Sequence, residues 1–212
     1  MIEPDFISTT RTSYNTVANH YAQLCKDELG GKPFDRGALT AFAEDTTGMI
    51  ADIGCGPGEL TAYLNGLGRT AYGIDLSTEM IAVARQTHPE LRFEVGSMLA
   101  LDIPDGTLGG IVAYYSTIHI PTELLPQVFA EFHRVLAPGG KVLLAFQAGE
   151  GNEMHLTEAF GGEVSLHYYF RSPDQVISLL EAAGLALYAK LLREPDETET
   201  RPRAYLLASK EG

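Results

Sequence analysis

Cysteine is scarce in this sequence: only Cys25 and Cys55 occur among 212 residues, far apart along the chain. Two such distant thiols argue against a disulfide framework and against a paired-thiolate zinc site. No apolar run reaches the length of a membrane span, and the first residues lack a charged leader followed by an apolar stretch. These absences lead us to expect a soluble cytoplasmic protein that has no contact with a membrane.

Basic residues are also few. The chain has 15 lysines and arginines against 28 acidic residues, for a formal charge of −13. The mean field of such a protein repels a phosphate backbone, and the sequence contains no run of lysine or arginine that would offset it. We therefore expect no nucleic-acid partner.

Other chemistries lack their usual motifs. The histidines are isolated, without the spacing of a metal site, and no G-x-S-x-G nucleophile elbow occurs. Hydrophobic residues make up 45% of the chain, as in an ordinary folded domain. We predict one domain over residues 1–212, no metal, and a monomer or a homodimer.

Apolar runs bounded by glycine and turn residues alternate with stretches of helical spacing, which is typical of an α/β fold with a doubly wound, mostly parallel sheet. The expected seven strands cover residues 49–53, 71–75, 91–95, 110–115, 141–146, 186–192 and 204–208. Helices are expected at residues 59–67, 78–86, 123–136 and 174–183, with a helical N-terminal cap over 13–44. Residues 194–203 read as a hairpin connection, so the last two strands should be antiparallel.

The most informative segment is a glycine turn, Asp52-Ile-Gly-Cys-Gly-Pro-Gly58, between the first strand and its helix. Such a turn either binds a ligand at the carboxyl edge of the sheet or is only a tight strand-to-helix connection without a ligand. Glu59 stands where a dinucleotide fingerprint needs a small residue, and its carboxylate would repel pyrophosphate. The chain also lacks a G-x-x-x-x-G-K-[ST] loop, so we expect a ligand without phosphates.

Asp75 ends the second strand, about 20 residues after the glycine turn. A carboxylate in that place accepts hydrogen bonds from both hydroxyls of a ribose. The alternative is an ordinary surface carboxylate.

Together these motifs resemble the class I S-adenosylmethionine-dependent methyltransferase family. The similarity runs over residues 49–146 and includes EFHRVLAPGG at 131–140. It implies S-adenosylmethionine as cofactor, a cap at 1–46, a cofactor-binding core at 47–148 and an acceptor-side segment at 149–212. The cofactor-binding residues that it implies are Asp52, Gly54, Cys55, Gly56, Gly58, Asp75, Leu76, Met80, Ser97, Met98 and Tyr114.

Some of these assignments leave alternatives open. Met80 resembles the apolar residue that covers the adenine ring in this family, with Leu76 on the other side, but it suits simple helix packing equally well. Many members have an aspartate after the third strand, whereas this chain has Gly96-Ser-Met. Contact with adenine would then fall to Ser97 or to the backbone of Met98.

Candidate catalytic residues follow the fourth strand. The resemblance implies that this edge lines the sulfonium, which makes Tyr115 a candidate contact for the methyl group and His119 a candidate base. A buried, hydrogen-bonded histidine is the alternative for His119. Because side chains alternate along a strand, we expect at most one of Tyr114 and Tyr115 to face the crevice.

The acceptor side is expected to include residues 149–170, as part of the pocket or its lid, with His167 and Tyr169 as substrate-binding residues. Alternatively, His167, Tyr169 and Arg171 form one face of an edge strand. Tyr14 and Tyr21 of the cap would close the other side of a pocket for a small acceptor.

These patterns favour transfer of a methyl group to oxygen or nitrogen of a small aromatic or polar molecule, with secondary metabolism as a setting. Two other functions remain open. One is a nucleoside-binding protein without catalysis, and the other is a nicotinamide-dependent oxidoreductase, against which Glu59 and the glycine spacing argue.

Overall fold

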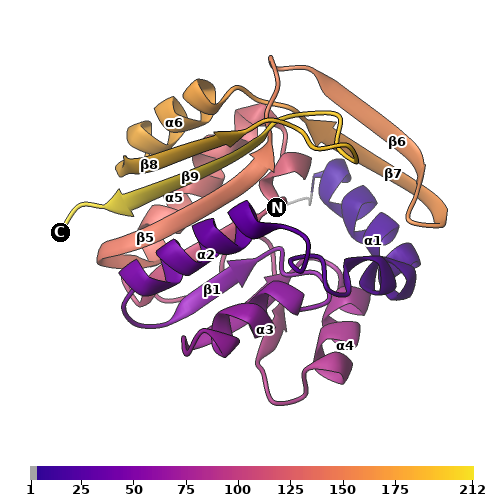
Figure 1. Ribbon diagram of the computed structural model, residues 1–212, viewed down its shortest axis with the longest axis horizontal. Helices are drawn as coiled ribbons and strands as arrows, with labels where there is room; N and C mark the ends of the chain where they lie inside the picture. Colours follow the sequence, from indigo (N-terminus) through magenta and orange to yellow (C-terminus); the bar gives the residue numbers. More distant parts are fainter. Residues whose placement is uncertain (1–3) are drawn as a thin grey trace.

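The computed structural model describes residues 4–212, and its centre is a seven-stranded sheet (Figure 1). The strands are β1 (Ile50–Ile53), β2 (Ala71–Asp75), β3 (Phe93–Val95), β4 (Leu108–Tyr114), β5 (Leu136–Gln147), β8 (Leu185–Arg193) and β9 (Arg203–Lys210). Their order is β3-β2-β1-β4-β5-β9-β8. Strands β3, β2, β1, β4 and β5 pair in parallel with their neighbours in this order. Strand β9 is antiparallel to both of its neighbours, β5 and β8. The prediction of a mostly parallel sheet with an antiparallel C-terminal strand is confirmed.

Helices cover both faces of this sheet. They are α1 (Asp5–Cys25), α2 (Pro33–Asp45), α3 (Glu59–Gly66), α4 (Thr78–Thr87), α5 (Leu125–Val135) and α6 (Pro173–Ala182), with short 3-10 turns η1 (Thr117–His119) and η2 (Thr122–Leu124). Phe42 of α2 and Leu64 of α3 pack on one face, while Phe129 and Phe132 of α5 and Leu180 of α6 pack on the other. All these side chains are fully buried, as the apolar stripe of a sheet-packed helix requires.

Strand β1 lies inside the sheet, between β2 and β4, and all four of its residues are buried. A parallel strand covered on both faces favours such a continuous apolar run over an alternating one. Helix α4 begins directly after β2 because Ser77 caps it, its Oγ accepting a hydrogen bond from the Met80 N–H at 3.1 Å. The connections after β1 and β2 are therefore short and lie side by side at the carboxyl edge.

Two elements lie outside the layered core, at that edge. Helix α1 starts well before residue 13, where the cap was expected to begin. Strands β6 (Glu153–Ala159) and β7 (Gly162–Tyr169) form a separate hairpin, turned by Phe160 and Gly161 with φ of 51° and 75°. The hairpin packs along α1 (Figure 1), and the Ser165 N–H donates to the Ser13 Oγ at 2.8 Å.

Some features are absent from residues 4–212. No helix there has both the length and the apolar character that a bilayer crossing demands. Nor do three His, Cys, Asp or Glu side chains of that part of the chain gather where they would hold a metal ion. Cys25 and Cys55 are free, and burial raises the pKa of the Cys25 thiol to about 12.

Gly58 closes the glycine turn with φ of 92°, and a Cβ there would lie 2.7 Å from Cζ of Phe93. We expect Gly58→Ala to lower the free energy of unfolding by about 2–4 kcal/mol, since left-handed strain and overpacking add. Gly68→Ala is the control, because Gly68 has φ of 79° but no atom within 4 Å of its Cβ position. It should cost only about 1–2 kcal/mol. Equal losses in urea unfolding would contradict a packing role for Gly58.

Candidate functional site

A cavity opens at the carboxyl edge of the parallel strands, next to α1. Its volume is about 780 Å³ with the solvent at its mouth included. The segments after β1 to β4 meet there, at the switch point where open α/β sheets bind ligands. The residues singled out from the sequence that line it are Tyr14, Tyr21, Gly54, Gly56, Asp75, Leu76, Met80, Ser97, Met98, Tyr114, Tyr115 and His119.

The glycine turn forms one wall of the cavity with bare backbone. Gly54 has φ of 80°, and a Cβ on it would collide with the side chain of Ser116. Ser116 is fixed in turn, because its Oγ donates to the Ile53 carbonyl at 2.6 Å. Only glycine allows the first and fourth strands to end this close together.

Asp75 joins the second strand to this wall. Its Oδ2 accepts the Gly56 N–H and its Oδ1 accepts the Ser77 N–H, both at 2.8 Å. Burial raises the pKa of the carboxyl group, against these hydrogen bonds that lower it. Each oxygen keeps a lone pair beyond its backbone bond, so the carboxylate can accept two further hydrogen bonds from neighbouring hydroxyls of a ligand.

Asp52 lies behind the main cavity, on a smaller one that it shares with Cys55, Gly54 and Gly56. Its Oδ2 accepts from the Thr61 hydroxyl at 2.7 Å, but its buried Oδ1 has no partner among residues 4–212. Burial raises the pKa of this carboxyl to about 7. A carboxylate oxygen left without a donor is costly, and a cationic group of a ligand would compensate it. Gly58 lines neither cavity.

Another part of the cavity wall is apolar. Leu76 and Met98 are partly buried there, and Met80 both lines the cavity and is 1% exposed in the core. The Ser97 Oγ accepts the Leu99 N–H at 3.3 Å, which holds the turn after β3. Met80 can therefore pack in the core and cover a ring in the cavity at the same time.

Tyr114 and Tyr115 both line the cavity, contrary to the expected alternation. The reason is that β4 ends at Tyr114, and Tyr115 has φ of 51°, which turns its side chain to the same side. The two rings meet edge to face with centroids 4.6 Å apart. The Tyr114 hydroxyl donates to the buried Asp35 Oδ1 at 2.5 Å, a partner from α2 that no sequence signal indicated.

His119 is buried and bonded through both ring nitrogens. Its Nδ1 lies 2.8 Å from the His167 carbonyl oxygen, which can only accept, so Nδ1 carries the proton. Its Nε2 then accepts from the Tyr14 hydroxyl at 2.7 Å. Burial lowers the pKa of His119 to about 4, so the ring is neutral at physiological pH.

The prediction that His167 and Tyr169 line the pocket is wrong, because it takes the outer face of β7 for the inner one. In β7 the buried positions are Val164, Leu166 and Tyr168, and the side chains between them face outward. His167 stacks on His155 at 4.3 Å, away from the cavity. Tyr168 faces inward instead, with its ring 4.7 Å from that of His119. A one-residue shift exchanges the two faces of a strand.

Arg171 follows this strand and does not share the outer face of His167 and Tyr169, as the alternative interpretation had it. It is 3% exposed, and its Nε donates to the Thr122 Oγ1 at 3.0 Å. Its other nitrogens donate to the carbonyls of Thr117 and Ile120, on either side of His119. Burial lowers its pKa to about 10. Arg171 thus holds in place the turn that carries His119.

Several lining residues were missed altogether. Three come from the first turns of α1, before the expected start of the cap, and the others are small or apolar residues of the strand ends. They are Phe6, Ile7, Thr10, Ile53, Gly96, Ser116 and Ile120. No motif marks them, because they enter the site through the placement of α1 and of the strand ends.

Comparisons with known proteins agree with this geometry. Residues 50–140 match the family model of a methyltransferase domain. An uncharacterized methyltransferase of Bacillus cytotoxicus is 31% identical over 141 residues, which is 66% of this chain and 59% of that protein. The malonyl-[acyl-carrier protein] O-methyltransferase of Pectobacterium atrosepticum is 31% identical over 113 residues, 53% of this chain and 43% of that protein. The chain thus spans less than two thirds of the length of these relatives.

A solved structure extends the similarity in fold. The 1,6-didemethyltoxoflavin-N1-methyltransferase of Burkholderia thailandensis, with 1,6-didemethyltoxoflavin and S-adenosylhomocysteine bound, superposes with a TM-score of 0.76. The alignment covers 100% of this chain and 92% of that one at 17% identity. The glycine turn and Asp75 lie within the residues that match the methyltransferase domain, and the chain shares the fold of this S-adenosylhomocysteine-bound enzyme.

Proposed function

We propose that this protein transfers a methyl group from S-adenosylmethionine to an oxygen or nitrogen atom of a small-molecule acceptor. The observation that carries the proposal is the pair of carboxylates on either side of a bare glycine turn, the half-buried Asp75 in the main cavity and the buried Asp52 behind it. The ribose of such a cofactor offers two hydroxyls and its methionine part offers an ammonium group. No phosphate has to be accommodated.

The residues present fit this cofactor. Asp75 has lone pairs to spare for the ribose hydroxyls, and the unpartnered Asp52 Oδ1 suits the ammonium group. Leu76, Met80 and Met98 offer an apolar slot for the adenine ring. Glu59 begins α3 and lies 3.6 Å from the His88 Nε2, so a carboxylate stands where a dinucleotide needs an open helix start. When bound, the cofactor supplies an electrophilic methyl group on a sulfonium.

A small acceptor is supported by a second chamber that adjoins the cavity. Both are lined by the same four tyrosines, Tyr14, Tyr21, Tyr114 and Tyr115. Walls of this kind stack on a flat ring and exclude water from it. The similar Burkholderia enzyme holds a small molecule together with S-adenosylhomocysteine, which supports the same class of acceptor here.

His119 acts through Tyr14 in this proposal. Both ring nitrogens of His119 are engaged, and its low pKa makes it a weak proton acceptor near pH 7. Because the Tyr14 proton points at His119, the oxygen of Tyr14 is left to accept a hydrogen bond from the N–H or O–H of an acceptor. Tyr14 therefore orients the acceptor, and His119 fixes the Tyr14 hydroxyl. Orientation is the main demand that methyl transfer makes on the protein.

Removing either carboxylate charge tests the cofactor assignment. We expect Asp75→Asn and Asp52→Asn each to weaken binding of S-adenosylmethionine and S-adenosylhomocysteine at least tenfold, since charge-assisted hydrogen bonds contribute about 1.5–3 kcal/mol. Asp102→Asn, at an exposed aspartate outside both cavities, should leave affinity unchanged. Calorimetric titration measures all three. Binding of NAD but of neither sulfur ligand by the wild-type protein would overturn the proposal.

The burial of His119 makes stability depend on pH in a defined direction. Its pKa is 6.5 ordinarily and about 4 in the folded chain, so between these values only the unfolded chain binds the proton. The free energy of unfolding should therefore fall as pH drops, by about 2 kcal/mol from about pH 7 to about pH 4.5 for this group. Urea unfolding of the wild type and of His119→Gln isolates the contribution of His119 to this pH dependence, because the buried aspartates titrate in both proteins. A difference between the two proteins that stays constant with pH would contradict a neutral, buried His119.

A further inference from the structure

The second chamber ends in polar groups that the proposed function does not use. It has a volume of about 700 Å³ with its opening, and Ile118, Phe160 and Tyr168 complete its apolar lining. At one side Gln147 and Arg203 face into it. Gln147 is the last residue of β5 and Arg203 the first of β9, and the two are direct partners in the antiparallel ladder. Their side chains therefore lie on the same face of the sheet.

Gln147 makes no side-chain hydrogen bond within residues 4–212. Its Oε1 is buried without a partner, and its Nε2 is the end of the amide that remains accessible. A buried amide oxygen without a donor is rare in proteins because burial without a hydrogen bond is costly, whereas the accessible Nε2 is a donor that a ligand can use. A ligand group in the chamber would restore at least the bond to the amide nitrogen.

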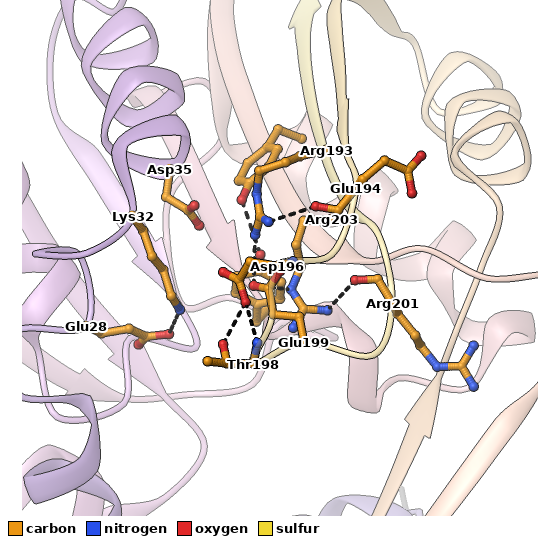
Figure 2. A network of polar contacts seen from close by, with 12 residues as sticks. Glu28, Lys32, Asp35, Arg193, Glu194, Asp196, Thr198, Glu199, Arg201 and Arg203 are labelled. Carbon is orange, nitrogen blue, oxygen red and sulfur yellow. Dashed lines mark hydrogen bonds and ion pairs between the residues drawn. The ribbon is translucent and has the colours of Figure 1, made fainter.

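Arg203 is held rigidly but keeps donors for a ligand. Its Nε donates to the Glu199 carboxylate at 3.2 Å, and its Nη1 to the Arg201 carbonyl at 3.2 Å. Glu199 also accepts from Arg193 at 2.8 Å, so one carboxylate serves two guanidinium groups (Figure 2). The Nη2 of Arg203 has no acceptor in the described part of the chain, and the guanidinium lies 5.6 Å from the ring centroid of Tyr115.

The other charges of the chamber are paired with each other. Lys32 and Glu28 both line it and form an ion pair at 2.9 Å (Figure 2). Arg203, by contrast, shares its carboxylate, Glu199, with Arg193. Two unused donors, from Arg203 and Gln147, stand beside aromatic rings.

We propose that this chamber binds an aromatic acceptor that carries a carboxylate, with the carboxylate on Arg203 and Gln147 and the ring among the tyrosines. Two donors on one side match the two oxygens of a carboxylate, and an arginine in a dry site is the preferred partner for that group. The protein carries a net charge of −13, so an anion binds only where such donors are built. A carboxylate held by a guanidinium is a poor nucleophile, and the methyl group therefore goes to another oxygen or nitrogen of the same molecule. This inference rests on the proposed function.

The test measures binding of aromatic acids and their amides to the protein saturated with S-adenosylhomocysteine. The probes are the three hydroxybenzoates and indole-3-carboxylate, each beside its carboxamide, titrated by calorimetry. We expect at least one acid to bind tenfold or more tightly than its amide. Arg203→Gln should remove that preference, because it should weaken binding of the acid about tenfold and change binding of the amide less than twofold. Gln147→Leu should weaken the same acid by a smaller factor.

Arg201→Gln is the matched control. Arg201 lies two residues away and loses the same charge, but its guanidinium lies over the ring of Phe170 at 3.8 Å, outside the chamber. It should bind the acid as the wild type does. Equal loss in Arg201→Gln and Arg203→Gln, equal affinity for acids and amides, or no binding of any acid at millimolar concentration would each overturn the inference. Failure to bind S-adenosylhomocysteine at all would instead overturn the proposed function, so the two failures are distinguishable.

Discussion

The hydrogen bond from the Gly56 N–H to the Asp75 carboxylate is the contact on which the site depends. It ties the turn after β1 to the end of β2, and the same carboxylate also accepts the Ser77 N–H where α4 begins. The connections after β1 and after β2 thus meet at one half-buried side chain. Because each oxygen has a second lone pair, the group that organises the wall is also the one available to the ligand. The position of the carboxylate that we propose to bind the ribose is therefore set by the fold itself.

Much of the layered core can be predicted from the sequence because its elements follow local rules. Strand β1 is a short apolar run between Gly48 and Gly54, and α4 is marked by its serine cap. The hairpin of β6 and β7 follows no such rule. Residues of β6 are mostly exposed on both faces and resemble a loop, since only pairing with β7, which packs along α1, makes them a strand. Helix α1 likewise begins earlier than its apolar spacing indicates.

The residues of the site also divide into those that the sequence predicts and those that it does not. The glycine turn and Asp75 are visible in the sequence, since backbone conformation and a strand end specify them. The aromatic side is not, because the left-handed Tyr115 breaks the alternation and a shift of one residue in β7 replaces His167 by Tyr168. Partners such as Asp35 for Tyr114 come from distant segments. Only tertiary structure brings these groups together.

This division has a consequence for how acceptor specificity is built. The match to a methyltransferase domain covers residues 50–140, which include the glycine turn, Asp75 and the slot after β3. The second chamber takes Tyr14 from α1, Phe160 and Tyr168 from the hairpin, and Arg203 from β9, all outside that range. Substitutions on these outer elements leave the contacts of Asp75 and the glycine turn unchanged. The acceptor that we propose would therefore be selected mostly by residues outside the matched domain, so the match alone does not identify it.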